Sequence, residues 1–283
     1  MSGVPGPGTG MTDFESRLVF IPGGSTGIGL AIARRFAARG ADVVIFARRE
    51  QPLIAATAAI RSVCRRDAQR VLWRQLDVAD AEQVRTVLGA AVTEIGVPDV
   101  LVNCAGRAIA NYFERIPLAQ VDESMRINFY GAWHAISTLL PHMQGRGGYI
   151  VNVASLAGLI GVFGYTDYAA SKFALVGFSE VLRSEVAERG ITVSVLCPPD
   201  TQTPGFEREN LTKPPETLAI SAGGGVLSAE EVADSLLAGM AKREFLIIPG
   251  RDARTAHRIK RFFRRLGLRI LDRSLRRAKR DRR

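Results

Sequence analysis

The sequence of 283 residues contains little cysteine, and this scarcity excludes two kinds of stabilised protein. Its three cysteines, Cys64, Cys104 and Cys197, are too few and too scattered for a disulfide framework. No two cysteines have the CxxC spacing that a structural zinc site commonly uses. We therefore expect a protein of a reducing compartment that holds no metal ion.

Long apolar runs are also missing. No stretch of about 18 consecutive apolar residues is present, so the sequence predicts no membrane-spanning helix. A basic segment followed by an apolar run, the pattern of a signal peptide, is not found near the start. Residues 1–12 are rich in glycine and proline and predict a flexible leader. We expect a cytoplasmic protein.

Basic residues are unevenly distributed along the chain, whose formal net charge is +10. Residues 251–283 contain 15 Lys and Arg against 3 Asp, whereas the other 250 residues contain 23 basic and 25 acidic side chains. The positive charge therefore belongs to a C-terminal tail. Such an asymmetry predicts an element that meets an anionic partner.

Short apolar runs typical of buried strands recur within residues 13–250, and stretches of helical spacing separate most of them. These runs lie at residues 18–21, 42–46, 71–76, 100–102, 149–153, 192–196 and 244–248. Apolar strands that alternate with helices indicate a parallel sheet buried on both faces. The predicted fold is a doubly wound, three-layer α/β domain of the Rossmann type.

Residues 200–225 interrupt this alternation. They are rich in proline, glycine and threonine, and the segment is too long for an ordinary connection. Segments of this length in a compact domain are usually lids or binding segments, so the sequence predicts a lid here.

A glycine-rich turn with the spacing GxxxGxG follows the first apolar run. Such a turn lets backbone N–H groups approach a pyrophosphate, and the helix that follows adds the positive end of its dipole. An ordinary strand-to-helix turn would look similar, so the motif needs support from other residues. The expected contacts with a dinucleotide are Gly23, Ser25, Thr26, Gly27, Ile28 and Gly29.

The end of the second run bears on the choice between NAD and NADP. Sites that prefer NAD place a carboxylate there for the ribose 2′-OH, and sites that prefer NADP place a cation for the 2′-phosphate. Here the run ends in Arg48 and Arg49, with no acid between them and the strand. Guanidinium groups bind phosphate bidentately, so we predict NADPH/NADP+, with Arg48 as the main contact. Arg49 is equally compatible with a solvated surface position.

Tyr168 and Lys172 are four residues apart, which on a helix places both on one face. A phenol with its ordinary pKa of about 10 is a poor acid–base group at neutral pH, and a neighbouring ammonium lowers that pKa. The pair is therefore a candidate general acid. Taken alone the spacing is often accidental, and it gains meaning from the polar residues around it.

Three further polar residues stand at positions suited to a site. Ser155 and Asn103 lie at the ends of apolar runs, where ligands bind at the carboxyl edge of an open α/β sheet. Asn128 lies in a helical stretch, where asparagine is mildly unfavourable. Each has an ordinary alternative as a cap or turn residue, but their combination in this order is not expected by chance.

Together these motifs resemble the short-chain dehydrogenase/reductase family, over about residues 17–248. The resemblance implies a catalytic tetrad of Asn128, Ser155, Tyr168 and Lys172. Besides the glycine-rich turn and the two arginines, it implies cofactor contacts from Asp77, Val78, Asn103, Ala105, Gly106, Tyr168, Lys172, Pro198, Thr201 and Thr203. The sequence departs from the family pattern at Pro22, Cys104 and Pro199, none of which is a catalytic group.

The reaction that this resemblance implies is hydride transfer between nicotinamide C4 and a carbonyl carbon. Tyr168 would protonate the developing alkoxide, and Ser155 would donate a hydrogen bond to it. Lys172 would hold the nicotinamide ribose and lower the pKa of Tyr168. Asn128 would hold a water that relays protons.

One segment narrows the resemblance. Residues 197–217 are similar to the corresponding segment of 3-ketodihydrosphingosine reductases, which use NADPH to reduce the 3-ketone of a long-chain amino alcohol. The implied substrate is a lipophilic amino ketone. Its expected contacts are Ser155, Tyr168, Phe163 and Asp200, with Phe163 in an apolar cleft for the alkyl chain and Asp200 near the amine. Core packing and capping of a lid helix are the alternatives for these last two residues.

Two other functions stay open on the sequence alone. One is a reductase of the same family for another lipophilic ketone, such as a steroid or a β-ketoacyl thioester. The other is a non-catalytic protein that binds a membrane or nucleic acid, against which the intact tetrad argues.

Apolar residues recur at helical spacing among the basic residues of the tail, at Ile259, Phe262, Phe263, Leu266 and Ile270. They predict one basic amphipathic helix of the kind that lies on anionic lipid, although the leucines at 268, 271 and 275 fall outside the stripe. We expect peripheral attachment to the cytoplasmic face of a membrane and no nucleic acid, with nucleic acid and a partner subunit as rival occupants. The family resemblance further implies a homodimer or homotetramer.

Overall fold

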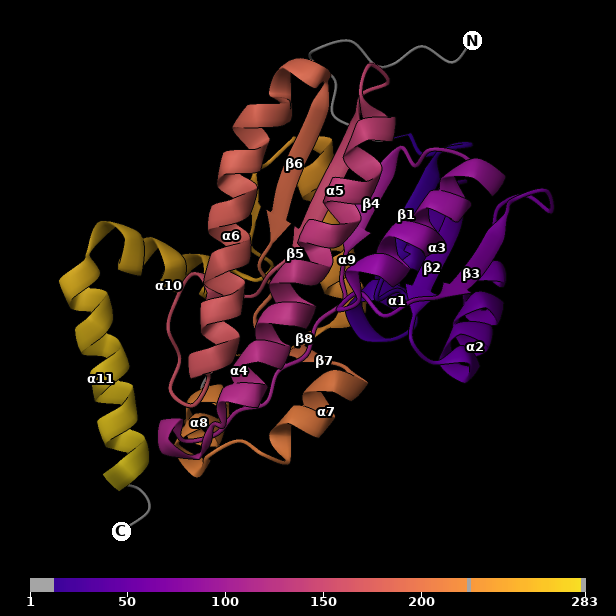
Figure 1. The fold of residues 1–283 in the computed structure, drawn as a ribbon. Helices are drawn as coiled ribbons and strands as arrows, with labels where there is room; N and C mark the ends of the chain where they lie inside the picture. Colours follow the sequence, from indigo (N-terminus) through magenta and orange to yellow (C-terminus); the bar gives the residue numbers. More distant parts are fainter. Residues whose placement is uncertain (1–12, 223–224, 281–283) are drawn as a thin grey trace.

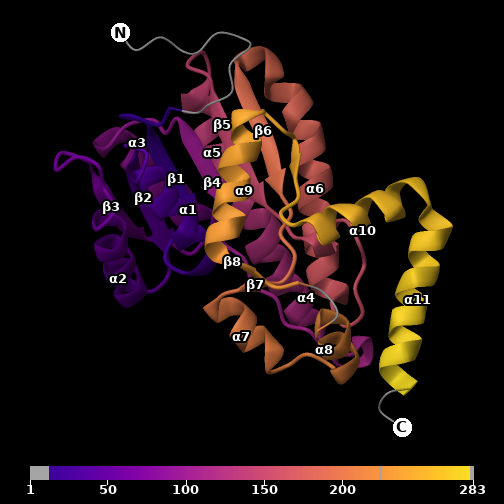
Figure 2. The ribbon, with the colours of Figure 1, turned by 180° about the vertical axis from the view of Figure 1, so that it is seen from behind.

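The computed structural model describes residues 13–222 and 225–280, which form a parallel sheet with helices on both faces (Figures 1 and 2). The predicted leader, residues 1–12, lies outside the described residues. The strands of the sheet are β1 (Leu18–Pro22), β2 (Asp42–Ala47), β3 (Val71–Gln75), β4 (Val100–Asn103), β5 (Gly148–Val153), β6 (Ile191–Leu196) and β9 (Leu246–Ile247). Their order is β3-β2-β1-β4-β5-β6-β9, and every neighbouring pair is parallel. This order confirms the predicted doubly wound fold.

Burial on both faces explains the continuous apolar composition of the central strands. In β1, Val19 and Ile21 pack in the core on one side of the sheet, and Leu18 and Phe20 pack in the core on the other side. Since side chains alternate between the two faces along a strand, one apolar run supplies both cores.

The helices divide between the two faces of the sheet. Helices α1 (Gly27–Ala37), α2 (Glu50–Arg61) and α9 (Ala229–Ala241) cover the face that Figure 2 shows in front. The other face carries α3 (Ala81–Glu94), α5 (Gly131–Met143) and α6 (Thr166–Val186), with α4 (Leu118–Met125) beside α6 (Figure 1). Shorter helical turns lie at Phe113–Arg115, Arg126–Tyr130, Leu156–Gly158 and Ala187–Arg189.

The segment predicted as a lid has secondary structure of its own. It contains β7 (Thr201–Gln202), α7 (Pro204–Asn210) and α8 (Pro215–Ala222), and β7 pairs in parallel with β8 (Leu227–Ser228). Thr203 begins α7 as its N-cap, with its Oγ1 accepting a hydrogen bond from Phe206 N at 3.0 Å. Both views place α7 and α8 beneath the carboxyl ends of the strands.

The tail forms two helices, α10 (Arg251–Phe262) and α11 (Arg264–Arg280), so the prediction of one continuous helix was wrong. Phe263 leaves the helical region, with φ −129° and ψ 58°, and α11 turns back to pack against α8 (Figure 1). Within residues 13–222 and 225–280, no helix combines the length and apolar character needed to span a bilayer.

Candidate active site

The residues predicted to form a site lie at the carboxyl ends of four neighbouring strands of the sheet. The glycine-rich turn follows β1, Asn103 ends β4, Ser155 follows β5 and Pro198 follows β6. Because β1, β4, β5 and β6 are parallel neighbours, these residues share one edge of the sheet. The lid lies at the same edge (Figure 1).

The glycine-rich turn packs against two other parts of this edge. Gly23 has a φ of +87°, and a Cβ there would overlap the backbone of Ala105 in the turn after β4. Gly27 has a φ of +54°, and its Cβ would lie 3.0 Å from Thr203 Cγ2 at the start of the lid. Only glycine fits these backbone conformations without strain, so the turn keeps its N–H groups close to the site.

The first turn of α1 presents its backbone N–H groups without a side-chain cap. Thr26 is the N-cap residue and makes no capping hydrogen bond, and the first turn contains no acidic residue. Ser25 and Ile28 are half-buried, and Gly29 is buried. The N–H groups and the helix dipole suit a phosphate, so this turn fits the pyrophosphate of a dinucleotide.

Arg48 and Arg49 lie at the end of β2 with their side chains exposed. The Arg48 side chain is 63% exposed, and its Nη1 lies 4.0 Å from Asp77 Oδ2. Arg49 is the N-cap residue of α2 and makes no capping hydrogen bond. Asp77, the implied adenine contact, accepts a hydrogen bond from Ala79 N at 3.0 Å. Both guanidinium groups are therefore accessible to an anion at this edge.

Other implied cofactor contacts belong to tightly packed loops. Val78 is buried after β3. The Pro198 carbonyl accepts a hydrogen bond from Leu156 N at 2.8 Å, and Thr201 Oγ1 donates to Pro199 O at 2.8 Å. The first bond ties the loop after β6 to the helical turn after β5, and the second closes a turn within the loop after β6.

Asn103 begins a chain of buried amide and hydroxyl groups. Its Nδ2 donates to Asn152 Oδ1 at 2.8 Å, and Asn152 Nδ2 donates to Ser179 Oγ at 2.8 Å. Sequence reasoning missed Asn152 and Ser179, because a polar residue inside an apolar strand or helix carries no motif. Among the described residues, the buried Asn103 Oδ1 has no hydrogen-bond partner, which leaves an acceptor for a ligand.

Asn128 lies in the π-helical turn between α4 and α5, a local geometry that is frequent at functional sites. Its Oδ1 accepts from Arg107 N at 2.9 Å, and its Nδ2 donates to Arg107 O at 3.0 Å and Ser171 Oγ at 2.9 Å. A Cβ on Gly106 would lie 3.2 Å from Asn128 Oδ1 and 3.3 Å from Lys172 Nζ. Asn128 and Lys172 therefore meet at Gly106.

Helix α6 brings Tyr168 and Lys172 to the residue that follows β5. The Tyr168 hydroxyl and the Ser155 side chain are hydrogen bonded. Lys172 Nζ donates to Val153 O at 2.9 Å and lies 5.8 Å from the centre of the Tyr168 ring. Lys172 is only 4% exposed, and this burial lowers the pKa of its ammonium to about 8. The structure thus places all three residues together, with Lys172 buried and Ser155 and Tyr168 half-buried.

The expected lowering of the Tyr168 pKa is not what the structure shows. Burial raises the pKa of the Tyr168 phenol well above its ordinary value, and the hydrogen bond with Ser155 offsets only part of that rise. The Lys172 ammonium is bonded to a backbone carbonyl and lies over the Tyr168 ring. Tyr168 therefore stays protonated at neutral pH, which is the state that a proton donor needs.

The two remaining substrate predictions fall in and beside the lid. The Phe163 ring is half-buried, in an edge-to-face contact with Tyr112 at 6.0 Å between centroids. Asp200 stands before β7, with Oδ2 3.9 Å from Lys213 Nζ. The N-cap of α7 is Thr203, so Asp200 does not have the capping role that was its alternative. Sequence reasoning missed Lys213, which is buried although it is a lysine in a polar segment.

Comparison with known proteins assigns the family. Residues 17–214 match the profile of a family described as short chain dehydrogenase. The chain belongs to the short chain dehydrogenase family. Its structure superposes on a short chain dehydrogenase/reductase from Burkholderia phymatum, solved in complex with NAD, with a TM-score of 0.79 and 25% sequence identity. The superposition covers 90% of this chain and 96% of that one.

Two vertebrate relatives are similar over most of this short chain dehydrogenase. A protein from Danio rerio named 3-dehydrosphinganine reductase is 42% identical over 217 residues, which are 76% of this chain and 65% of that protein. A 3-ketodihydrosphingosine reductase from Bos taurus is 40% identical over 221 residues, 77% of this chain and 67% of that protein. The chain thus spans about two thirds of the length of these relatives.

As a short chain dehydrogenase, the protein is an oxidoreductase that uses a nicotinamide nucleotide. The glycine-rich turn, the uncapped first turn of α1 and Asn103 Oδ1, which has no partner within the described part of the chain, fit such a group. When bound, the nicotinamide supplies or accepts the hydride. The chain itself contributes a protonated phenol, Tyr168, held by Ser155.

Proposed function

We propose that the protein catalyses the NADPH-dependent reduction of the 3-ketone of 3-ketosphinganine to give sphinganine. The observation that carries the proposal is the half-buried, protonated Tyr168 bonded to Ser155, in a chain similar to two vertebrate reductases named for this substrate. Reduction requires a proton donor beside the carbonyl oxygen, and a neutral phenol is one. The exposed guanidinium groups of Arg48 and Arg49 support NADPH over NADH.

Each polar residue around Tyr168 has a part in this reaction. Tyr168 donates its proton to the ketone oxygen as hydride adds to the carbonyl carbon, so that the ketone becomes a secondary alcohol. Ser155 donates a hydrogen bond to the same oxygen. Lys172, whose pKa of about 8 lies near neutral pH, returns a proton to the phenolate through a relay that Asn128 holds.

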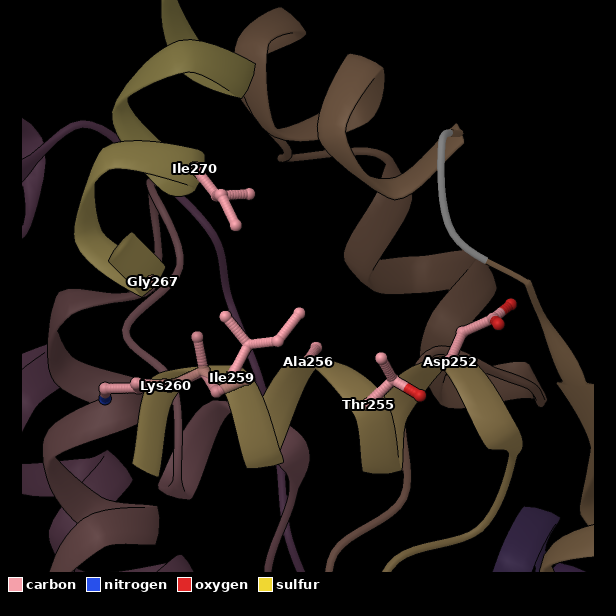
Figure 3. A pocket seen from close by; sticks show the side chains of 8 residues that line it. Asp252, Thr255, Ala256, Ile259, Lys260, Gly267 and Ile270 are labelled. Carbon is pink, nitrogen blue, oxygen red and sulfur yellow. The ribbon is translucent and has the colours of Figure 1, made fainter. Parts of the chain in front are cut away.

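The long alkyl chain of this substrate needs an apolar site. Ile160, in the loop after the catalytic serine, lines a cavity of about 270 Å³ between the two tail helices (Figure 3). Figure 3 shows Ile259 of α10 and Ile270 of α11 pointing into this cavity. Lys260 Nζ donates to Leu159 O at 2.7 Å, which fixes α10 against the same loop. We place the distal part of the alkyl chain in this cavity.

A panel of ketones tests the proposed function. The full-length protein is given NADPH with 3-ketosphinganine, a steroid ketone or a β-ketoacyl thioester, and NADPH oxidation is followed by absorbance. We expect the highest kcat/KM for 3-ketosphinganine, with sphinganine identified as the product by mass spectrometry. Preference for another ketone would reassign the substrate, and lack of turnover with every ketone would favour a non-catalytic protein.

We also propose that the tail meets an anionic membrane surface on the cytoplasmic face. Phe262, Phe263 and Leu266 expose large apolar side chains, and Arg261 and Arg265 expose guanidinium groups beside them. Apolar residues interleaved with arginine are typical of helices that lie in the interface of a bilayer. Each basic residue near an anionic surface contributes about 1 kcal/mol of attraction. A water-insoluble substrate gives this attachment a purpose.

For its quaternary structure we propose a homodimer or homotetramer that uses α5 and α6. Trp133 and Val181 are large exposed apolar residues on these helices, with Tyr130 exposed just before α5. Exposed apolar residues that gather on neighbouring elements mark interaction surfaces. Sedimentation of the wild type is expected to show a dimer or tetramer that Trp133→Glu dissociates, and a monomeric wild type would overturn the proposal.

A further inference from the structure

A lysine is buried inside the lid, next to α8. The Lys213 side chain has no exposed surface, and its Nζ lies 3.1 Å from Glu209 Oε1 and 3.9 Å from Asp200 Oδ2. We call Asp200, Glu209 and Lys213 the lid charge cluster. Lysine is almost never fully buried unless it is paired, so the contacts of Lys213 with the two carboxylates are needed to offset the cost of its burial.

Aromatic residues hold two members of the lid charge cluster in place. Lys213 Nζ lies 4.1 Å from the centre of the Phe206 ring, a cation–π distance. The Tyr165 hydroxyl donates a hydrogen bond to Glu209 Oε1. Asp200 has a looser position, because its side chain is 33% exposed and its ion pair with Lys213 is the longer one. The cluster therefore has one accessible carboxylate.

The charges of the cluster do not balance. Two carboxylates face one ammonium, which leaves one negative charge when all three groups are ionised. An uncompensated charge in a buried place is costly, and a cation at this place would relieve that cost. The Lys213 ammonium makes its shorter contact with Glu209, so Asp200 is the carboxylate that it compensates less. The net negative charge and the partial exposure of Asp200 suit a small cationic ligand group.

The cluster lies next to the catalytic phenol. The rings of Tyr165 and Tyr168 are 5.7 Å apart between centroids. After burial, the charges of Glu209 and Asp200 are among the causes that raise the pKa of Tyr168, so both carboxylates act on its hydroxyl. In an α-amino ketone the ammonium is borne by the carbon next to the carbonyl. With the ketone oxygen at Tyr168 and the amine-bearing side of the substrate facing the lid, that ammonium lies near the cluster.

We propose that the lid charge cluster is the receptor for the ammonium group of an α-amino ketone substrate, with Asp200 as its direct partner. Glu209 is a positioning residue that Tyr165 and Lys213 hold in place. Lys213 neutralises one of the two carboxylates, so that a single negative charge receives a single positive one. This inference rests on the proposed function, because it states how the same site selects its substrate.

The test compares 3-ketosphinganine with an analogue of equal chain length that lacks the amine. With full-length enzyme and saturating NADPH, Asp200→Asn and Glu209→Gln should lower kcat/KM for the amino ketone by about tenfold to a hundredfold. Their kcat/KM for the amine-free ketone should stay within about threefold of the wild type. Glu207→Gln is the matched control, since Glu207 is an exposed carboxylate on α7, and it should leave both values unchanged.

Substitution of Lys213 is expected to change the preference for the amino ketone in the opposite direction. Lys213→Met keeps an apolar stem against Phe206 and leaves both carboxylates to the substrate. The ratio of kcat/KM for the amino ketone over the amine-free ketone should then rise above that of the wild type. If Lys213→Met does not fold, the two carboxylate variants and the Glu207→Gln control still test the proposed receptor.

Failure of the receptor and failure of the proposed function give different results. Equal losses on both ketones in Asp200→Asn and Glu209→Gln would overturn the receptor while wild-type turnover upholds the reaction. If the wild type reduces neither ketone, the proposed function fails, and binding of sphinganine and N-acetylsphinganine to the enzyme with NADP+ decides. Tighter binding of the free amine, abolished by Asp200→Asn, would support the receptor, and equal binding of the two compounds would overturn it.

Discussion

Tyr168 and Lys172 show how burial sets the acid–base properties of individual residues in this site. Burial raises the pKa of the Tyr168 phenol and lowers the pKa of the Lys172 ammonium to about 8. Both shifts favour the neutral form, because a charge loses its hydration inside the protein. The phenol thereby keeps the proton that a reduction consumes, and the lysine is able to exchange a proton near neutral pH.

The lowered pKa of Lys172 also makes the stability of the protein depend on pH. Its ordinary value is 10.5, so between about pH 8 and 10.5 the unfolded chain binds more protons than the folded chain. The contribution of Lys172 to the free energy of unfolding therefore rises over this range. Relative to Lys172→Met, we expect the wild type to gain about 3 kcal/mol from the lower to the higher pH. Urea denaturation of both proteins at the two pH values measures this, and a constant difference would contradict it.

Under the proposed function, Arg48 is the residue that sets the preference for NADPH over NADH. Its exposed guanidinium lies where the 2′-phosphate of NADPH is expected, and a carboxylate there would repel that phosphate and accept from a 2′-OH. We expect Arg48→Asp to lower kcat/KM for NADPH by about tenfold or more and to raise it for NADH. Arg189→Asp is the control, because Arg189 is an exposed arginine just before β6, at the amino ends of the strands and away from the cofactor site. An unchanged preference for NADPH in Arg48→Asp would show that Arg48 does not bind the 2′-phosphate.

At the scale of elements, the strands could be predicted because burial on both faces leaves an uninterrupted apolar run. The run at 42–46 forms β2 over Asp42–Ala47, and the run at 192–196 forms β6 over Ile191–Leu196. The run at 244–248 forms a ladder only over Leu246–Ile247, since β9 is an edge strand with β6 as its single neighbour. Apolar pattern therefore fixes the presence of a strand better than its ends.

Much of the site could be predicted as well, because its residues follow strands or share a helix face. The interactions inside the site could not. Lys213 and Asp200 are thirteen positions apart in a polar segment, and only the packing of the lid brings them together. The raised pKa of Tyr168 depends on burial, and the turn at Phe263 depends on backbone angles that no motif announces. These features belong to tertiary packing, which a single sequence does not display.

A further prediction concerns binding of the tail helices to anionic vesicles. We expect the full-length protein to float with vesicles that contain phosphatidylserine and to stay unbound with phosphatidylcholine alone. Reversing Arg261 and Arg265 to Glu should weaken the vesicle affinity by about tenfold or more, since each lost basic residue removes about 1 kcal/mol. Reversing Arg146 and Arg189, which are exposed outside the tail, should have little effect. Equal flotation with both lipids would contradict an electrostatic attachment.

At the scale of the whole molecule, the edge of the sheet, the lid and the tail form one connected region. The lid lies beneath the carboxyl ends of the strands, and α11 packs against α8 of the lid (Figures 1 and 2). The lid has an accessible carboxylate, which suits the cationic head of an amphiphile. The tail has exposed phenylalanines, which suit the apolar end of the same molecule. The proposed substrate, with a cationic head and an alkyl chain, matches this division.

Turnover of 3-ketosphinganine by Tyr168→Phe shows whether Tyr168 is the proton donor, because this substitution keeps the ring and removes only the hydroxyl. We expect NADPH to bind with a Kd within about threefold of the wild type, measured by its fluorescence. We expect kcat to fall by about a hundredfold or more, as loss of a general acid predicts. If the variant binds NADPH normally and keeps the turnover of the wild type, Tyr168 is not the proton donor and the account is wrong.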